Sequence, residues 1–393
     1  MKINLYAALL LVMSFAAVAH AAEPVCTDQN DATCAAKPAE VAAEKTPTLR
    51  ETIDSGKAKI AETLFGLDVM AFGDAQSFYN DAGDPAYQWG TFEVDAAIDT
   101  SYDIQGAIAV VQDAYTTTMT VGFLDYNTSG ARIAPRGRLS VEKGFHVQIG
   151  RFDIPFGNDW QFFASKDSVS ISRPLSTDQV MGGGYNDEGI RVFANNGSFN
   201  YNSYLLHGLH GGRLVGGRIG ITPFSDPFSL KSTKDPKNFE FGLSYLHDGG
   251  ADWSKNETAW AVDAEVRFEP WVARLEYLDR TIDFSVANGV DRLRGWHLTQ
   301  EYSLDEVVAS PTVLFLRYGE GITNPAEITS VGADQGDERD ARVDVGFSAN
   351  LGNSNVFQWK FEVQQYLNAT PNSRQAGGFG HKPYWFTQLV VIL

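Results

Sequence analysis

The sequence predicts an all-β protein: a transmembrane, antiparallel β-barrel of about sixteen strands, preceded by a short N-terminal helical segment in the periplasm. Many short segments alternate apolar and polar residues, turn-forming residues separate them, and the connections tend to alternate between short and long. A period of two places successive side chains on opposite faces of a strand. Membrane barrels combine such alternation with short turns at one end and long loops at the other.

A hairpin over residues 256–280 shows the alternation most clearly. Pairing its two halves places Phe268 opposite Trp271 and puts the large apolar residues on one face. On the other face, Glu265 is expected opposite Arg274, so that the two charges neutralise each other. A soluble sheet also buries one apolar face, so the alternation alone leaves lipid and a protein core as alternatives.

The start of the chain has the features of an exported protein. Residues 1–21 combine Lys2 with an apolar run and small residues near a cleavage site, which predicts a secretory signal peptide outside the fold. Residues 22–47 are rich in Ala, Lys, Glu and Pro, and we expect a linker there. Because exported proteins favour disulfides, a small loop closed by Cys26 and Cys34 is favoured over free thiols.

Residues 48–80 are predicted to form a helical periplasmic segment. Apolar residues recur near one face of the first part of this stretch, although Gly56 interrupts the pattern. A lone periplasmic helix or plug is favoured over a short coiled coil that promotes trimers, because fewer than three heptads are present. The apolar residues are Leu49, Ile53, Ile60, Leu64 and Leu67.

The composition excludes some classes of partner. The formal net charge is −18, which argues against binding to nucleic acid or anionic lipid surfaces. After the signal peptide no run of about 18 apolar residues occurs, so no membrane-spanning helix is expected. No nucleophile elbow, zinc-protease motif or phosphate-binding glycine loop is present, and catalysis is not expected.

The predicted barrel covers residues 88–393. Sixteen segments alternate or are bounded by turn residues, and the segment at 133–141 has the weakest pattern. The predicted strands are 89–99, 103–112, 117–126, 133–141, 145–154, 188–195, 199–207, 214–222, 238–246, 258–268, 271–280, 293–303, 311–319, 339–349, 356–367 and 384–393.

The lengths of the predicted connections favour lipid on the apolar face. If the last strand ends in the periplasm, the periplasmic links include the tight turns 196–198 and 269–270, and the external links include the long segments 155–187 and 320–338. A soluble sandwich has no reason to sort its loops by length. The link 223–237 is an exception, since it is long on the short side.

The alternation slips before the longest connection. Without a correction, Arg151 and Asp153 would share a face with the preceding apolar residues. A bulge at Gly150 would turn these two charges toward the lumen. The same bulge would turn three apolar residues toward lipid, namely Phe152, Ile154 and Phe156.

This region carries a family resemblance. The sequence GRFDIPFG at 150–157, followed by SKDSVSISRPL at 165–175 and a glycine-containing strand at 186–208, resembles the phosphate-selective porin O and P family of Gram-negative outer membranes. The similarity extends over about 88–393. It implies a sixteen-stranded, usually trimeric barrel whose third external loop folds inward, and it assigns the constriction to 158–187. The constriction residues expected from it are Lys166, Asp167, Arg173 and Asp178.

The lumen charges depart from the family pattern. Phosphate-selective members line the pore with arginines and lysines, whereas the charges assigned to the lumen here are mixed in sign, so a phosphate-specific ladder is not expected. The predicted pore-lining residues are Glu93, Asp95, Arg151, Asp153, Arg191, Arg218, Asp263, Glu265, Arg267, Arg274, Glu276, Arg342, Asp344, Lys360 and Glu362.

The sequence therefore predicts a porin in the outer membrane of a Gram-negative bacterium. Small hydrophilic solutes or ions would diffuse through it passively, with a weak preference for cations or none. The expected partners are outer-membrane lipid, lipopolysaccharide, the solutes and two further copies of the chain in a homotrimer. No cofactor, metal or nucleic acid is expected.

Two other classes stay open at this point. The first is a secreted, soluble β-sandwich that binds or hydrolyses carbohydrate, with the apolar face as its core. The second is a structural outer-membrane barrel without an open pore, plugged by the segment before Trp89.

Overall fold

The computed structural model describes most of the predicted barrel. The described residues are 55, 67–79, 85–99, 103–113, 115–128, 144–162, 164–182, 185–196, 198–208, 211–222, 238–250, 256–268, 270–284, 289–305, 307–308, 310–324, 338–352, 356–368 and 383–393. The predicted signal peptide, the linker with Cys26 and Cys34, and the predicted helix up to residue 66, apart from Ser55, lie outside them.

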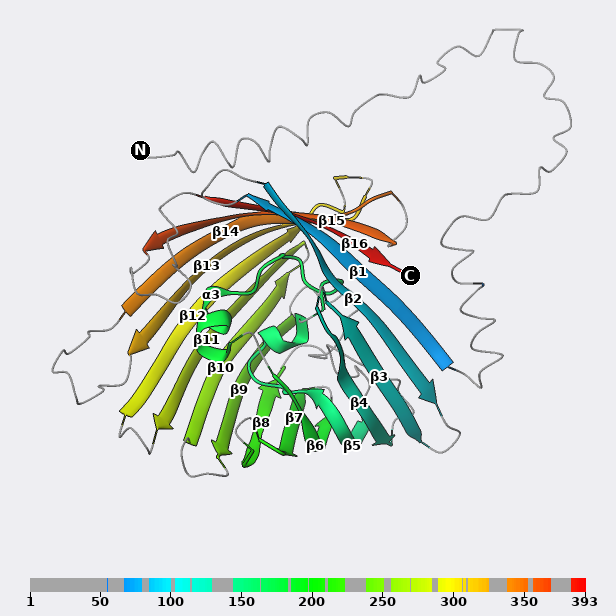
Figure 1. Ribbon diagram of the computed structural model, residues 1–393, viewed down its shortest axis with the longest axis vertical. Helices are drawn as coiled ribbons and strands as arrows, with labels where there is room; N and C mark the ends of the chain where they lie inside the picture. Colours follow the sequence, from blue (N-terminus) through cyan, green and yellow to red (C-terminus); the bar gives the residue numbers. More distant parts are fainter. Residues whose placement is uncertain are drawn as a thin grey trace, which may run out of the picture.

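Sixteen antiparallel strands of the described chain form one closed barrel, in which each strand pairs with its sequence neighbours and β1 pairs with β16 (Figure 1). The predicted fold class and strand number are confirmed, and a two-sheet sandwich is excluded. The strands are β1 (Leu67–Tyr79), β2 (Pro85–Asp99), β3 (Ile104–Gln112), β4 (Thr117–Asn127), β5 (Gly144–Asp153), β6 (Asn186–Asn195), β7 (Phe199–Leu206), β8 (Arg213–Ile221), β9 (Asn238–Gly249), β10 (Asn256–Phe268), β11 (Trp271–Phe284), β12 (Gly289–Ser303), β13 (Thr312–Asn324), β14 (Glu338–Asn350), β15 (Phe357–Asn368) and β16 (Tyr384–Ile392).

The hairpin of β10 and β11 has the predicted register. Phe268 lies opposite Trp271, and Glu265 lies opposite Arg274. Trp260 is 39% exposed on the outer face while Asp263, on the inner face, is 1% exposed. Large apolar residues therefore face outward in this hairpin and charged residues face the interior, as the alternation predicts.

The prediction for residues 48–80 is wrong over its second half. Residues Leu67–Tyr79 form β1, and β1 joins β2 on one side and β16 on the other. The barrel therefore begins at Leu67 and not at 88, and this stretch is neither a periplasmic helix nor a plug. Its alternation is hidden by small residues, because Gly73 and Ala75 interrupt the apolar face.

The weakest predicted strand, 133–141, lies outside the described residues. The barrel does not need it between its predicted neighbours, because β4 pairs directly with β5. The barrel still has sixteen strands among the described residues, because β1 was not predicted and makes up the number. The long link from β5 to β6 is still the third link at its end of the barrel, as predicted.

The predicted bulge at Gly150 is absent. The register of β5 runs without a shift past Gly150 against both β4 and β6. Phe152 therefore points inward, where it is 1% exposed, and its ring lies 4.4 Å from the guanidinium carbon of Arg191. This cation–π contact and an apolar inner core, described below, replace the lipid contact that the sequence predicted.

The link from β5 to β6, residues 154–185, enters the barrel; we call it the inward segment. It contains a 3₁₀ helix, η2 (Asp159–Phe162), and a short helix, α3 (Leu175–Met181), which packs against β11, β12 and β13 (Figure 1). Gly182 ends α3 in the left-handed conformation, with φ of 62°. Among the described residues, no helix is long and apolar enough to cross a membrane.

The links are sorted by length less cleanly than predicted. At the end that holds the C-terminus, 196–198 and 269–270 are tight, but 128–143 and 222–237 are long. At the other end 325–337 is long, but 285–288 has only four residues because β11 and β12 extend into the predicted loop. Most strands are thus longer than the alternating pattern in the sequence predicts.

The edge of β2 over residues 85–89 is unpaired on the β3 side within the described chain. Residues 85–89 pair with β1, the β1 register then shifts and resumes at Phe92, and the register with β3 begins only at Phe92. The turn between β3 and β4 follows Gln112, so these two strands are too short to cover the rest of β2. Trp89, within this edge, is 80% exposed.

Candidate functional site: the inward segment and the lumen wall

The inward segment has an apolar side that packs against the inner wall. Phe156 and Trp160 of the segment are 7% and 3% exposed. They belong to one buried cluster that includes inward-facing residues of the wall, such as Leu246 and Leu278, each 0% exposed. Burying side chains of this size stabilises the packed segment by about 1.5–3 kcal/mol each. A hydrophobic core inside the barrel therefore holds this half of the segment.

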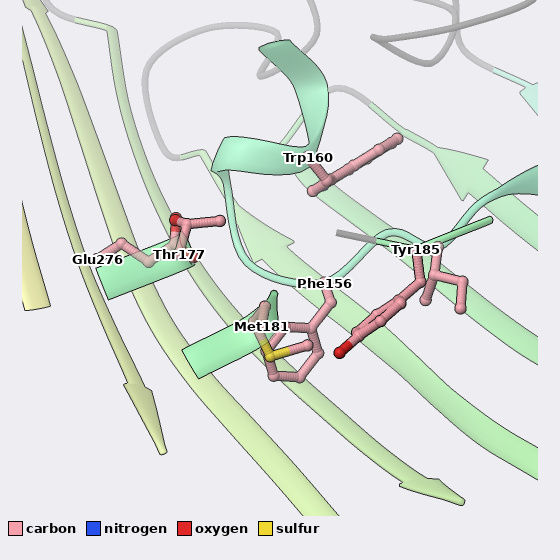
Figure 2. A pocket seen from close by; sticks show the side chains of 7 residues that line it. Phe156, Trp160, Thr177, Met181, Tyr185 and Glu276 are labelled. Atoms are coloured by element: carbon pink, nitrogen blue, oxygen red, sulfur yellow. The ribbon is translucent and has the colours of Figure 1, made fainter. Parts of the chain in front are cut away.

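A water-sized cavity of about 20 Å³ lies at the edge of this core (Figure 2). Its wall is mostly apolar, with Phe156 and Met181 from the inward segment, while Thr177 and Glu276 lie together on one side. A cavity of this size holds one water molecule at most. It is a packing defect between the segment and β11 and does not form a path for solutes.

Basic residues of the wall bind the carbonyl groups of the segment. Lys360 of β15 donates to the backbone oxygens of Ser165 and Ser168. Arg317 of β13 donates to the Ser172 carbonyl at 3.1 Å. Two further arginines do the same: Arg342 with the carbonyl of Arg173, and Arg280 with that of Val180 at 2.7 Å. These cations satisfy backbone oxygens that no helix or strand pairs.

Acidic residues of the wall bind the amide groups of the segment. The Glu362 carboxylate of β15 accepts from the Ile171 and Ser172 amides at 2.7 and 2.9 Å. The Glu276 carboxylate of β11 accepts from the Asn158 and Asp159 amides at 3.0 and 3.1 Å. Hydrogen bonds to charged groups are the stronger kind, so these carboxylates fix two separate points of the segment.

Three further hydrogen bonds, each with a neutral group of the segment, add more anchors. The Gly157 amide donates to Ser244 Oγ at 3.0 Å, and Ser176 Oγ lies 2.8 Å from His297 Nδ1. Gln179 donates to Asp340 at 2.6 Å. The anchors therefore span the wall from β9 to β15, and the segment is tied to more than a third of the barrel circumference.

The remaining inner charges pair with each other. Arg218 contacts Asp263 at 2.6 Å and Glu240 at 2.8 Å. Arg274 contacts Glu265 at 2.6 Å and also contacts Glu301. These pairs leave little free positive charge on the wall, in keeping with the mixed signs of the predicted lining residues.

The predicted lining residues, with one exception, lie inside the barrel or are buried in its wall. Arg267 and Arg274 are partly exposed. The others are covered by the inward segment or by neighbouring side chains: Glu93, Asp95, Asp153, Arg191, Arg218, Asp263, Glu265, Glu276, Arg342, Asp344, Lys360 and Glu362.

The exception is Arg151. It lies opposite Glu188, in register beside the outward-facing pair Ile149 and Ile190, which are 58% and 46% exposed. Arg151 contacts Glu188 at 3.5 Å on the outer face. The prediction that it lines the lumen is wrong because the bulge that would turn it inward does not form.

The four predicted constriction residues all lie in the inward segment. Asp167 is exposed and Lys166 contacts it at 2.7 Å. Arg173 and Asp178 are partly exposed. Burial raises the pKa of the Asp178 carboxyl above its ordinary value, with Arg342 and Arg173 opposing the shift. We call these four charged residues the polar side of the segment.

A further carboxyl group, Asp159 in η2, was not identified from the sequence. Burial raises its pKa above the ordinary value, although Arg173 and Arg317 oppose the shift. Its charge also acts on Asp178. The segment therefore carries two carboxyl groups that are easier to bury when protonated.

Sequence reasoning also missed several anchoring residues. Arg317 could have been found, because Leu314, Leu316 and Tyr318 share the opposite parity of the same strand and form its outer face. No pattern in the sequence identifies Ser168, Ser170 or Ser172 as partners of the wall, since they lie in an irregular segment. In the described part of the chain, no group of three or more His, Cys, Asp or Glu side chains is arranged to hold a metal ion.

Solved structures with the same fold are outer-membrane proteins. The trimer form of in-vitro folded OmpT of Vibrio cholerae has a TM-score of 0.56 at 12% identity, and the match covers 83% of this chain and 99% of that one. OmpF of Salmonella typhi, in complex with daunomycin, has a TM-score of 0.56 at 9% identity, with 83% and 97% covered. The high-pH structure of OprB of Pseudomonas putida gives 0.53 at 12% identity, with 86% and 97% covered.

These likenesses show the fold, which is that of outer-membrane β-barrels in Gram-negative bacteria. No family model matches the chain, and no curated protein matches its sequence. The membership in the phosphate-selective porin family that the sequence resemblance implies therefore stays a prediction.

Proposed function

We propose that the protein is an outer-membrane porin through which small hydrophilic solutes or ions diffuse passively, without catalysis. The observation that carries the proposal is the inward segment: it crosses the interior of a closed barrel and is fixed to strands from β9 to β15. Its polar side, with Lys166, Asp167 and Arg173, would face the solute. A fixed constriction with a polar surface selects by size and charge.

Charge supports a weak preference for cations or none, and not for phosphate. Lys360, Arg317 and Arg342 are all engaged with carbonyl groups of the segment or with carboxylates. An incoming phosphate would have to displace these partners. If the chain belongs to the phosphate-selective porin family, as its resemblance implies, it would be a member without the family's selectivity.

Planar-bilayer recordings test this proposal. We expect discrete conductance steps, and in a potassium chloride gradient a reversal potential near zero or on the cation side. A strongly anion-selective reversal potential would overturn the charge argument. Insertion of folded, heat-modifiable protein without conductance would favour a structural barrel closed by the inward segment, the second candidate. For a plug formed before Trp89, only the residues in strands are excluded, such as Leu67–Tyr79, which form β1.

The proposed partners are membrane lipid, including lipopolysaccharide, and further copies of the chain. The edge of β2 over 85–89 supports a homotrimer, because unpaired backbone groups are not tolerated in hydrocarbon and a second copy would cover them. Cross-linking from Trp89→Cys tests this, with Trp260→Cys of β10, on the opposite side of the barrel, as the control. Dimer and trimer bands from the first variant alone are expected. Only monomers, in spite of efficient labelling, would contradict it.

We also propose an orientation in which the end with the C-terminus faces the periplasm. The tight turns 196–198 and 269–270 at that end support it. The links 285–288 and 325–337 then lie outside the cell.

A further inference from the structure

The outer face of β10 to β14 changes from apolar to aromatic to charged residues along the strands. One row across these strands is apolar, with Leu275 of β11 opposite Leu298 of β12. The next row pairs Tyr277 with Trp296, and Trp296 with Glu320. Beyond it the register aligns Asp279, Arg294, Ile322 and Arg339, one residue from each of β11 to β14, and three of these four are charged. Arg292 lies one row higher on β12.

Aromatic contacts mark where the apolar surface ends. The rings of Trp260 and Tyr277 are 5.1 Å apart, and those of Trp296 and Tyr318 are 5.2 Å apart. Tyrosine and tryptophan collect at the boundary between hydrocarbon and headgroups in membrane barrels. Trp260 lies opposite Asp279, within the charged row, and Tyr277 and Trp296 form the row next to it. The charged row is therefore at the depth of lipid headgroups.

Carboxylates of neighbouring strands hold Arg292 and Arg339. Arg292 donates to both oxygens of Asp279, at 3.1 and 2.7 Å. Arg339 donates to Glu320, which also accepts from Trp296 Nε1 at 3.3 Å and from the Tyr318 hydroxyl. Each carboxylate is thus fixed by neighbouring side chains and in turn fixes one guanidinium group.

The exposed charge of the patch is positive, although the whole chain carries −18. The side chains of Arg292 and Arg339 are 52% and 56% exposed, whereas those of Asp279 and Glu320 are 3% and 13% exposed. The outward surface therefore presents guanidinium edges and hides the carboxylates. Such edges match the paired oxygens of a phosphate group.

We propose that Arg292, Arg294 and Arg339, with the aromatic row beneath them, form a binding surface for the phosphorylated headgroup of an outer-leaflet glycolipid. The acyl chains would lie on the apolar row and the phosphates on the arginines. The occupant is a lipid, because the patch lies on the outer face of the barrel at the edge of the hydrocarbon. The inference rests on the proposed orientation but not on an open pore.

Binding to lipid A tests the inference with purified full-length protein in detergent. The probes are lipid A with both phosphates and the same lipid after chemical removal of the phosphates. The test variant is Arg292→Gln with Arg339→Gln. The control is Arg151→Gln with Arg213→Gln, which removes two outer-face arginines from β5 and β8. Native mass spectrometry or the shift in unfolding temperature on titration reports the affinity.

We expect the phosphorylated lipid to bind the wild type and the control equally, and the test variant about tenfold or more weakly, since hydrogen bonds to charged groups are lost. The dephosphorylated lipid should bind all three proteins weakly. Equal affinity of wild type and test variant, or no preference for phosphate, would overturn the proposal. If the test variant does not fold, Arg292→Lys with Arg339→Lys should fold and weaken binding by a smaller factor, because lysine binds phosphate without the planar fork. Unchanged binding by this lysine pair would also overturn it.

A labelling experiment separates a failure of the orientation from a failure of binding. Arg339→Cys in intact cells should react with a membrane-impermeant thiol reagent added outside. Absence of labelling would place the patch at the inner leaflet and overturn the glycolipid partner, whatever the affinity in detergent. Conductance should be the same for the test variant and wild type, because these side chains lie on the outer face. A loss of conductance in a folded variant would contradict that placement.

Discussion

Most basic side chains on the described inner wall bind a carboxylate of the wall or a carbonyl group of the inward segment. Arg317 contacts Asp344 at 2.7 Å and also bonds Ser170 Oγ at 3.1 Å. Lys360, 0% exposed, bonds two carbonyls of the inward segment. A residue that faces a lumen is therefore not necessarily a residue that meets the solute.

The partly exposed charged residues of the inner wall should affect the selectivity between cations and anions. Glu265 compensates both Arg267 and Arg274. Glu265→Gln leaves these arginines under-compensated, and we expect a several-fold fall in the cation-to-anion permeability ratio at 0.1 M salt. The fall should shrink at 1 M, where the screening length drops from about 10 Å to about 3 Å.

The control for this prediction is Glu188→Gln, which removes a carboxylate that is 66% exposed on the outer face. Reversal potentials in salt gradients give the permeability ratio. An equal shift in both variants, or none in either, would show that Glu265 is remote from the ion path.

Acid should tighten the packing of the inward segment. Burial raises the pKa of Asp159 and Asp178 above the ordinary value of 3.8. A raised pKa means that these two carboxyl groups stay protonated to a higher pH when the segment is packed than when it is released. The packing free energy is therefore largest below about pH 4 and falls as the pH rises through the raised values.

Hydrogen exchange of residues 154–185, corrected for its intrinsic pH dependence, measures this. Protection of the segment should decrease between acid and neutral pH in the wild type. Asp159→Asn with Asp178→Asn should flatten this change. Protection that increases with pH in the wild type would contradict the sign.

Among the elements, the inward segment depends on two different kinds of attachment. Its apolar side is held by burial, with Phe156 and Trp160 in a core that the wall completes. Its backbone is held by side chains of the wall, such as Glu276 and Arg342, that bind its amide and carbonyl groups. Loss of either kind should loosen only the half that it holds.

Phe156→Ala tests the apolar half. Removing a buried phenylalanine costs about 3–5 kcal/mol. Because the core lies inside the barrel, we expect faster hydrogen exchange of the segment and larger open-channel current noise, with the strands unchanged. Phe145→Ala removes the same side chain from a 38% exposed position on the outer face of β5. It should leave both signals as in the wild type, and equal effects of the two variants would argue against an internal core.

Sequence patterns predicted the elements that follow a single period. The register of β10 and β11 was predicted residue by residue, because large apolar and charged residues alternate there without a break. β1 was missed because small residues dilute its alternation. The inward position of Phe152 was missed because a barrel interior was assumed to be polar, and only the folded segment supplies apolar partners for it.

The predicted constriction rested on a resemblance, and the structure places those residues on the segment that crosses the interior. Their contacts could not be predicted. Bonds such as those from Lys360 to Ser165 and Ser168 join positions almost two hundred residues apart, and depend on an irregular path of the backbone. Periodicity carries no information about such a path.

In the whole molecule, the outer and inner faces of the barrel have different roles. Apolar and aromatic rows with a belt of arginines face the membrane, and paired charges with an internal core hold the inward segment. The unpaired edge of β2 over 85–89 and the exposed Trp89 mark the side of the wall at which we propose contact with another copy. The central claim is that solutes pass along the polar side of the inward segment.

Charge added at Asp167 tests that claim most directly, because this residue is the exposed member of the predicted constriction. Asp167→Cys is recorded in bilayers before and after modification with a negatively or a positively charged methanethiosulfonate reagent. Ser203→Cys, at an exposed position of the outer face of β7, and the unsubstituted chain are the controls. We predict that both reagents reduce the single-channel conductance of Asp167→Cys, that only the positive reagent moves the reversal potential toward anions, and that neither control changes. Unaltered conductance and selectivity of fully modified Asp167→Cys would contradict the account.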